Sequence, residues 1–125
     1  MKPENLYKIE DGISTNGSTQ VFRAVIDPQS GIFRGHFPGA PVLPGVCTLS
    51  IVKDCLERVV MKKTTICEIS QCKFTGMVDP LQEQSMSIEI EVSPADEERG
   101  KLSANVKMSE TERVIMKFRG GYRIG

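Results

Sequence analysis

The sequence contains no tryptophan, a single histidine and no excess of either charge, because 16 Lys and Arg residues balance 16 Asp and Glu residues among 125. Broad binding to nucleic acid or to an anionic membrane requires a surplus of positive charge, so this composition argues against both. No apolar run approaches the roughly 18–20 residues of a membrane span, and residues 1–8 contain no apolar signal core. We therefore expect a cytoplasmic protein that binds neither nucleic acid nor membrane.

Metal-binding motifs are also missing. The four cysteines include no CxxC pair, and one histidine cannot complete a Cys/His set of recognisable spacing. Reduced thiols and no bound metal are the expectation. The length suits one domain over residues 1–125, with a core modest enough that further apolar surface could be buried between subunits. The cysteines are Cys47, Cys55, Cys67 and Cys72.

The apolar residues that are present predict mostly antiparallel sheet. They alternate with polar residues in the period of two that marks a strand with one buried face. A charged stretch that ends at Gly100 reads as a hairpin loop, and Asn16-Gly17 and Asp79-Pro80 are further turn signals. The predicted strand regions are residues 6–13, 18–26, 64–78, 86–92, 102–108 and 114–124.

One long helix is predicted between these strands, from Pro44 to about Met61. Proline suits the first helical turn, and Lys62 and Lys63 place positive charge at the C-terminal end of the helix dipole. A single helix against an antiparallel sheet is an α+β layer architecture. Its mostly apolar arc comprises Thr48, Leu49, Val52, Cys55, Leu56, Val59 and Val60, and its polar arc comprises Ser50, Lys53, Asp54, Glu57 and Arg58.

The segment before this helix contains the candidate catalytic groups. Residues 35–46 contain three prolines and three glycines, a composition that makes a stiff, shaped loop rather than regular structure. The loop holds His36, whose side-chain type suits proton transfer near neutral pH. The N–H groups at the helix start can stabilise a developing oxyanion. A base beside such a site suits proton abstraction next to a thioester carbonyl, although a structural histidine in a proline-rich loop is an equally good interpretation.

This segment resembles a known signature. His36-Phe37-Pro38-Gly39-x-Pro41-x-x-Pro44-Gly45-Val46 is similar to the motif of the hotdog-fold 3-hydroxyacyl-[acyl-carrier-protein] dehydratases of the FabZ/FabA type, with eight defined positions in eleven. Residues 72–81 resemble, more weakly, the strand and turn KF-x-x-x-V-x-P-G-D of the same family, and the likeness extends over roughly residues 18–124. The resemblance implies a long helix wrapped by a curved antiparallel sheet, and a dimer with active sites at the subunit interface.

The resemblance also implies roles for individual residues. His36 would remove the α-proton of the 3-hydroxyacyl thioester, and the backbone N–H of Gly45 would polarise the thioester carbonyl. The remaining positions would bind substrate along the acyl tunnel. These positions are Phe37, Pro38, Val42, Val46 and Cys47. Cys47, at the helix start, could have a pKa lowered by the helix dipole, but a buried core thiol is the favoured interpretation.

One position departs from the family pattern. Fourteen residues after the histidine, the family has a Glu or Asp that helps expel the hydroxyl as water, and this chain has Ser50, which cannot act as a general acid at neutral pH. Asp54 lies four residues further along the same helical face and is the nearest alternative, although it could simply pair with Arg58. In this respect the chain is similar to short dehydratase-like proteins of aryl-polyene type, which lack the usual acid.

Three functions remain open at this stage. The first is a dehydratase acting on thioesters of acyl carrier protein or CoA in fatty-acid or polyene-type biosynthesis, without metal or redox cofactor. The second is a hotdog thioesterase, and the third is a non-catalytic acyl-binding subunit that pairs with an active homologue. A homodimer or higher homo-oligomer is expected. An acidic carrier protein could face the basic side chains of the last strand, although a solvated sheet face is as good an interpretation; they are Arg113, Lys117, Arg119 and Arg123.

Overall fold

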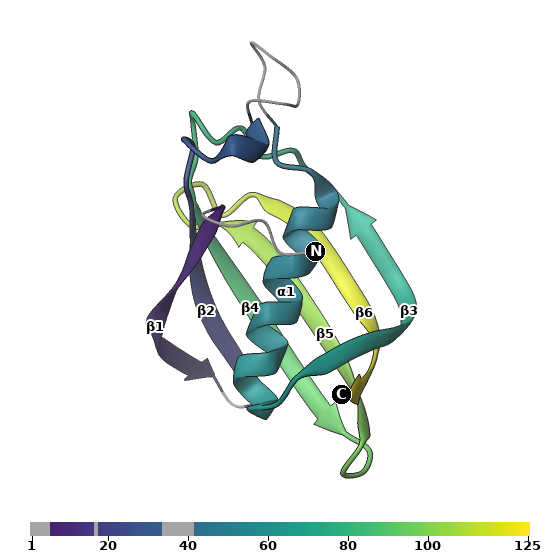
Figure 1. Cartoon of the computed structure of the whole chain (residues 1–125). Helices are drawn as coiled ribbons and strands as arrows, with labels where there is room; N and C mark the ends of the chain where they lie inside the picture. Colours follow the sequence, from purple (N-terminus) through teal and green to yellow (C-terminus); the bar gives the residue numbers. More distant parts are fainter. Residues whose placement is uncertain (1–5, 17, 34–41) are drawn as a thin grey trace.

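The computed structural model describes residues 6–16, 18–33 and 42–125, and for residues 11–16 and 32 it describes the backbone alone. One long helix, α1 (Gly45–Val60), lies against an antiparallel sheet (Figure 1). A short 3-10 helix spans Gly31–Phe33. The strands are β1 (Tyr7–Asn16), β2 (Thr19–Ile26), β3 (Thr64–Phe74), β4 (Ser85–Pro94), β5 (Arg99–Met108) and β6 (Val114–Ile124).

The six strands form one sheet in the order β1-β2-β4-β5-β6-β3, and every neighbouring pair is antiparallel. The sheet curls around α1, so that β1 and β3 form its two edges on either side of the helix (Figure 1). The alternating segments predict this sheet correctly because their apolar residues occupy the face toward α1. On β4, for example, Met86, Ile88 and Ile90 are buried while Ser87 and Glu89 are half-exposed.

Several predicted boundaries differ from the structure: β1 continues past residue 13 to Asn16, and β5 begins at Arg99 rather than at Leu102. The strand predicted over residues 64–78 ends at Phe74, where the chain leaves the sheet after Thr75 N–H donates to the Ile115 carbonyl at 2.8 Å. Pro44 caps the helix in an extended conformation rather than opening its first turn, and α1 begins at Gly45. Met61, at the other end, adopts a left-handed conformation that stops the helix.

The buried face of α1 differs in part from the predicted arc. Its fully buried residues follow the three- and four-residue spacing of one helical face. Ile51, which the predicted arc omits, is among them, whereas Leu49, Val59 and Val60 are only half-buried. The sheet packed against the helix decides which of its faces is buried, and the buried face is the one that contains Ile51. The fully buried residues are Cys47, Thr48, Ile51, Val52, Cys55 and Leu56.

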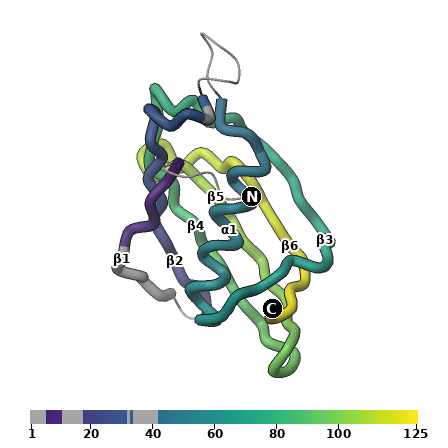
Figure 2. The backbone as a smooth tube through the Cα atoms, viewed as in Figure 1, coloured from purple at the N-terminus to yellow at the C-terminus, as the bar shows by residue number. Residues whose placement is uncertain are grey.

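At one end of the barrel-like sheet, two irregular segments lie side by side: the residues just before α1 and the connection from β3 to β4 (Figure 2). Leu43 N–H donates to the Val78 carbonyl at 3.0 Å and joins them directly. His36, Phe37 and Pro38 fall in residues 34–41, outside the described residues. No helix among the described residues is both long and apolar enough to cross a membrane.

Candidate active site

The N-terminus of α1 offers backbone N–H groups to a ligand oxygen. Pro44 precedes the helix in an extended conformation (φ −61°, ψ 144°), and the first turn contains no acidic side chain. The first N–H groups of an α-helix have no intrahelical partner, and together they carry a partial positive charge. Gly45, which begins the helix, therefore occupies a position suited to an oxygen that gains negative charge.

The end of β3 packs directly against this helix start. A Cβ atom placed on Gly45 would lie 2.9 Å from Phe74 Cζ, so the aromatic ring occupies the space that any larger residue at position 45 would need. This close contact explains glycine at position 45 through packing rather than through backbone conformation. It also places the Phe74 ring beside the helix N-terminus.

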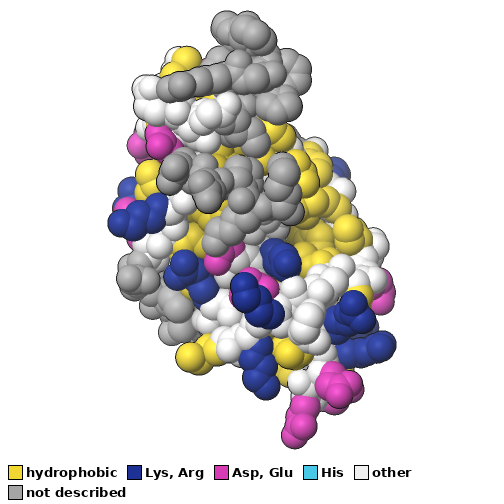
Figure 3. All heavy atoms as spheres, in the orientation of Figure 1, with side chains coloured by type: hydrophobic (Ala, Val, Ile, Leu, Met, Phe, Trp, Pro, Cys, Tyr) yellow, Lys and Arg dark blue, Asp and Glu magenta, His cyan; other side chains and the backbone are white. Residues whose placement is uncertain are grey.

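An apolar pocket of about 300 Å³ adjoins this contact. Val42 is half-buried, Phe74 and Met77 are 48% and 67% exposed, and these three residues form its mouth. The deeper residues are buried, and Ile115 on β6 is 2% exposed. Hydrophobic side chains gather on the surface around β3 and the start of α1 (Figure 3). The described lining residues are Val42, Leu43, Pro44, Gly45, Thr48, Phe74, Gly76, Met77, Val78 and Ile115.

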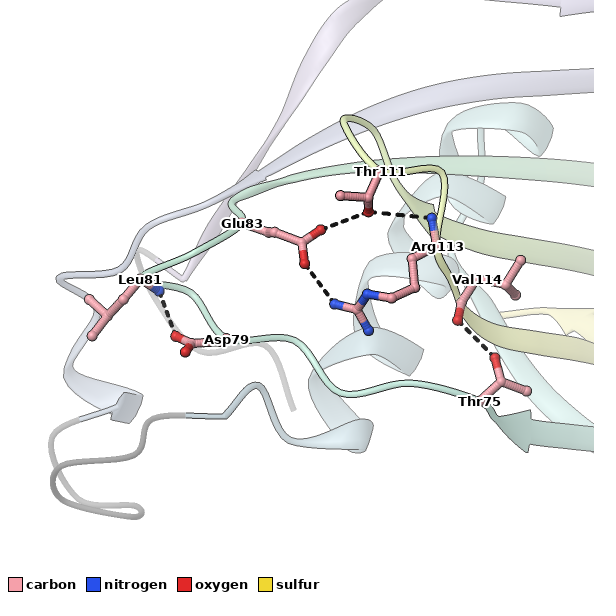
Figure 4. A network of polar contacts seen from close by, with 7 residues as sticks. All are labelled: Thr75, Asp79, Leu81, Glu83, Thr111, Arg113 and Val114. Carbon is pink, nitrogen blue, oxygen red and sulfur yellow. Dashed lines mark hydrogen bonds and ion pairs between the residues drawn. The ribbon is translucent and has the colours of Figure 1, made fainter.

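The connection from β3 to β4 forms part of this pocket and is held by an ion pair. Arg113 Nη2 lies 2.7 Å from Glu83 Oε1, and the Thr111 hydroxyl donates to Glu83 Oε2 at 3.0 Å (Figure 4). The hydrogen bond from Arg113 holds the pKa of Glu83 below its usual value. Beside this pair, the Thr75 hydroxyl donates to the Val114 carbonyl at 2.9 Å. Arg113 therefore anchors the pocket wall while remaining exposed, and it precedes β6, whereas Lys117, Arg119 and Arg123 lie on that strand.

Ser50 and Asp54 lie in a different place, an open groove of about 450 Å³ on the outer side of α1. The Ser50 hydroxyl donates to the Val46 carbonyl at 3.1 Å. The Asp54 side chain is 15% exposed and contacts Tyr7 and Arg58 among the described residues: the Tyr7 hydroxyl donates to Oδ2 at 3.0 Å, and Arg58 Nε lies 3.4 Å from Oδ1. Both partners stabilise the ionised carboxylate. The pairing of Asp54 with Arg58 considered from the sequence is confirmed.

Tyr7 is a residue that sequence reasoning missed. Burial raises its pKa, and the charge of Asp54 raises that pKa further. The phenol therefore remains protonated and donates to Asp54. No local motif marks Tyr7, because its partner lies 47 positions away in the sequence. Phe74, by contrast, belongs to the second stretch of family resemblance, which could have identified it.

The structure brings together only some of the predicted site residues. Val42 and Gly45 line the apolar pocket. Val46 is 54% exposed and Cys47 is 1% exposed, and neither is among the residues that line the pocket. Burial raises the pKa of the Cys47 thiol, which agrees with a core thiol and not with one activated by the helix dipole. Ser50 and Asp54 share the groove, as their spacing predicts.

Comparison with known structures supports the hotdog fold. A subunit of the dehydratase heterocomplex ApeI:P from Xenorhabdus doucetiae matches with a TM-score of 0.70 and 20% identity, over 98% of this chain and 99% of that one. A hypothetical thioesterase from Streptococcus pneumoniae, solved with coenzyme A, matches with a TM-score of 0.66 and 11% identity, over 95% and 85%. Thioesterase superfamily member 2 from Mus musculus gives a TM-score of 0.66 and 11% identity, over 96% and 83%.

Sequence comparison identifies the family. No curated protein is significantly similar to this chain. The family model described as ApeI-like, ApeI dehydratase, matches residues 12–116, which is most of the chain and includes the loop before α1, the helix and the pocket wall. This match confirms the resemblance to hotdog-fold dehydratases that the motif around His36 indicates. The chain belongs to the ApeI-like dehydratase family.

Proposed function

We propose that this protein eliminates water from a 3-hydroxyacyl thioester, carried on acyl carrier protein or CoA, and releases a 2-enoyl thioester. The observation that carries the proposal is the apolar pocket that adjoins the N-terminus of α1 at Gly45. An acyl chain needs an apolar cavity, and its thioester carbonyl needs hydrogen-bond donors at the point where negative charge develops. Membership of a dehydratase family supports the same reaction.

In the proposed mechanism, His36 takes the α-proton while the Gly45 N–H stabilises the charge on the carbonyl oxygen. The electron pair of the broken C–H bond forms the new double bond, and the C–O bond to the hydroxyl breaks. His36 then returns its proton to the departing hydroxyl, which leaves as water. Asp54 has no part in these steps, because its hydrogen bonds from Tyr7 and Arg58 favour the carboxylate, which cannot supply a proton.

The proposed working form is a homodimer or higher homo-oligomer. Strand β3 is an edge of the sheet, and its Ile69 is 56% exposed. An exposed edge strand with apolar side chains offers unpaired N–H and C=O groups to a second strand. Pairing of two β3 edges would place two sheets side by side. An unlike hotdog partner is the alternative, since one structurally similar chain comes from a heterocomplex.

Thioester hydrolysis is the second candidate function. A thioesterase needs a carboxylate to activate water, and Asp54 lies in an open groove beside Ser50. Its contacts with Tyr7 and Arg58 count against that role, because both stabilise the carboxylate charge and so make it a weaker base. The third possibility, an acyl-binding subunit without activity of its own, predicts binding but neither reaction.

One experiment separates the three. Purified protein is incubated with a 2-enoyl and a 3-hydroxyacyl thioester of acyl carrier protein, and the products are resolved by chromatography and mass spectrometry. The dehydratase interconverts the two thioesters without releasing carrier thiol. Release of free acid and thiol supports the thioesterase instead. Binding without either product supports the non-catalytic subunit, and adding a candidate hotdog partner then tests whether activity requires it.

A further inference from the structure

We infer that Thr48 is a specificity-determining residue of the apolar pocket, where its hydroxyl binds the 3-hydroxyl of the acyl group. The inference rests on the proposed function for the identity of the acyl group. Among the described residues that line the pocket, Thr48 alone has a polar side chain. Thr48 is also 2% exposed, so this residue belongs to the buried part of the pocket lining and not to its mouth.

A hydroxyl in this position has to form a hydrogen bond. Burying a polar group without a partner costs free energy. The other described residues that line the pocket have apolar side chains or none, so apart from a backbone carbonyl such as that of Pro44, one helical turn earlier, the pocket itself offers the hydroxyl no acceptor. The other fully buried residues of α1 are aliphatic or cysteine, so the packing of the helix does not require a hydroxyl at position 48. A substrate hydroxyl that enters the pocket supplies a partner of the right chemistry.

The spacing between the two polar groups matches the substrate. Thr48 follows Gly45 by three residues, so both lie on the same helical face, with their side-chain positions about 5–6 Å apart. In a 3-hydroxyacyl thioester only one carbon separates the carbonyl carbon from the carbon that bears the hydroxyl. In the inferred arrangement the carbonyl oxygen lies at the Gly45 N–H and the 3-hydroxyl lies at Thr48, within one helical turn, while the chain continues toward Ile115.

Ser50 is the other hydroxyl near the helix start, and it is placed differently. Its hydroxyl donates to the Val46 carbonyl, and Ser50 lines the outer groove, whose lining residues have none in common with those of the apolar pocket. The two hydroxyls therefore face different surroundings, although only two positions separate them. Thr48 is the one that a bound acyl chain would meet.

Binding measurements test this inference. The probes are pantetheine amides of 3-hydroxyoctanoic and octanoic acid, in which an amide replaces the thioester so that neither elimination nor hydrolysis interferes. Calorimetric titration should show that the wild-type protein binds the 3-hydroxy amide about five- to tenfold more tightly, the value of one hydrogen bond. In Thr48→Val this ratio should fall to about one, while affinity for the octanoyl amide stays the same.

Two further variants serve as controls for Thr48→Val. Thr48→Ser keeps the hydroxyl and should retain the preference, which also covers the case in which Thr48→Val fails to fold. Thr64→Val removes another buried threonine hydroxyl, at the start of β3, and should leave the preference unchanged.

Three outcomes would overturn the inference: equal binding of the two amides by the wild-type protein, a preference that survives in Thr48→Val, or no binding of either amide. An equal loss of affinity for both amides in Thr48→Val would also overturn it, because it would mean that the hydroxyl only supports the backbone. If the preference behaves as expected but the thioester assay shows no elimination, the proposed function fails and the assignment of Thr48 stands.

Discussion

Tyr7 and Asp54 are joined by a hydrogen bond of 3.0 Å that ties β1 to the outer side of α1. The phenol donates to one carboxylate oxygen, and Arg58 approaches the other. A carboxylate held on both oxygens serves as a structural link between strand and helix. On this relationship we base the prediction that Asp54 does not replace the acid that the family has at position 50.

Asp54→Asn should therefore change dehydration by no more than about threefold, far less than the 10²–10⁴-fold that a general acid contributes. The same variant should lose about 1 kcal/mol of stability, because the charged partner of Tyr7 and Arg58 is gone. Urea denaturation and the elimination rate are measured on the same samples, with Tyr7→Phe as a control that removes only the donor. If Asp54→Asn slows elimination a hundredfold while its stability is unchanged, Asp54 acts as the general acid and the prediction is wrong.

His36→Ala should abolish most of the activity and leave the fold intact. A positioned acid–base group is worth about 10²–10⁴-fold in rate, and in the proposed mechanism this histidine both removes and returns the proton. Chromatographic detection of the enoyl product measures the loss, and circular dichroism checks the fold. A loss smaller than tenfold would contradict the assignment of His36.

Gly45→Ala should displace the Phe74 ring, because the new methyl group would lie 2.9 Å from the ring tip. We expect a cost of about 1–2 kcal/mol from this overpacking, together with weaker binding of acyl amides at the pocket mouth. The double variant Gly45→Ala, Phe74→Ala should show a smaller cost than the sum of the two single changes. Gly31→Ala is the matched control, because nothing lies within 4 Å of a Cβ atom there. Additive costs would show that the ring does not constrain position 45.

The Glu83–Arg113 pair should make the free energy of unfolding depend on pH in the acidic range. Hydrogen bonding from Arg113 lowers the folded-state pKa of Glu83, so the unfolded chain binds a proton more readily than the folded protein does. The stabilisation is therefore present above the unfolded pKa and is lost as the pH falls below about 5 and through the lowered folded pKa.

Glu83→Gln should flatten this part of the stability profile and cost about 0.5–1 kcal/mol at neutral pH, because the pair is partly exposed. Thermal melts between acidic and neutral pH, with the exposed Glu110→Gln as control, measure the difference. Parallel profiles for the wild type and Glu83→Gln would refute a role for the pair.

The protein should be at least a dimer at micromolar concentration, and Ile69→Asp should shift it toward the monomer. A charge on the exposed edge strand β3 opposes pairing with a second edge. Analytical ultracentrifugation gives the mass directly. A folded wild-type protein that sediments only as a 13.8 kDa monomer would contradict the prediction of an oligomer.

Much of the fold could be predicted because its signals are local. Alternation along residues 86–92 and 102–108 marks two strands, since side chains of a strand point to opposite faces in turn. Three- and four-residue spacing marks α1 for a similar reason. Ile51 was missed because the arc was judged from sequence alone, whereas the sheet that curls over the helix decides which of its residues are buried.

The sequence by itself determined the strands, the single helix, the proline-rich segment before it and the family, because each depends on the order of nearby residues. Only the tertiary structure decided that Phe74 packs on Gly45, that Arg113 holds Glu83 and that Tyr7 holds Asp54. The last two pairs are 30 and 47 positions apart, and no local pattern encodes such distances. They form only when the sheet closes around the helix, which brings β1 against the outer side of α1 and the connection from β3 to β4 against the residues before β6.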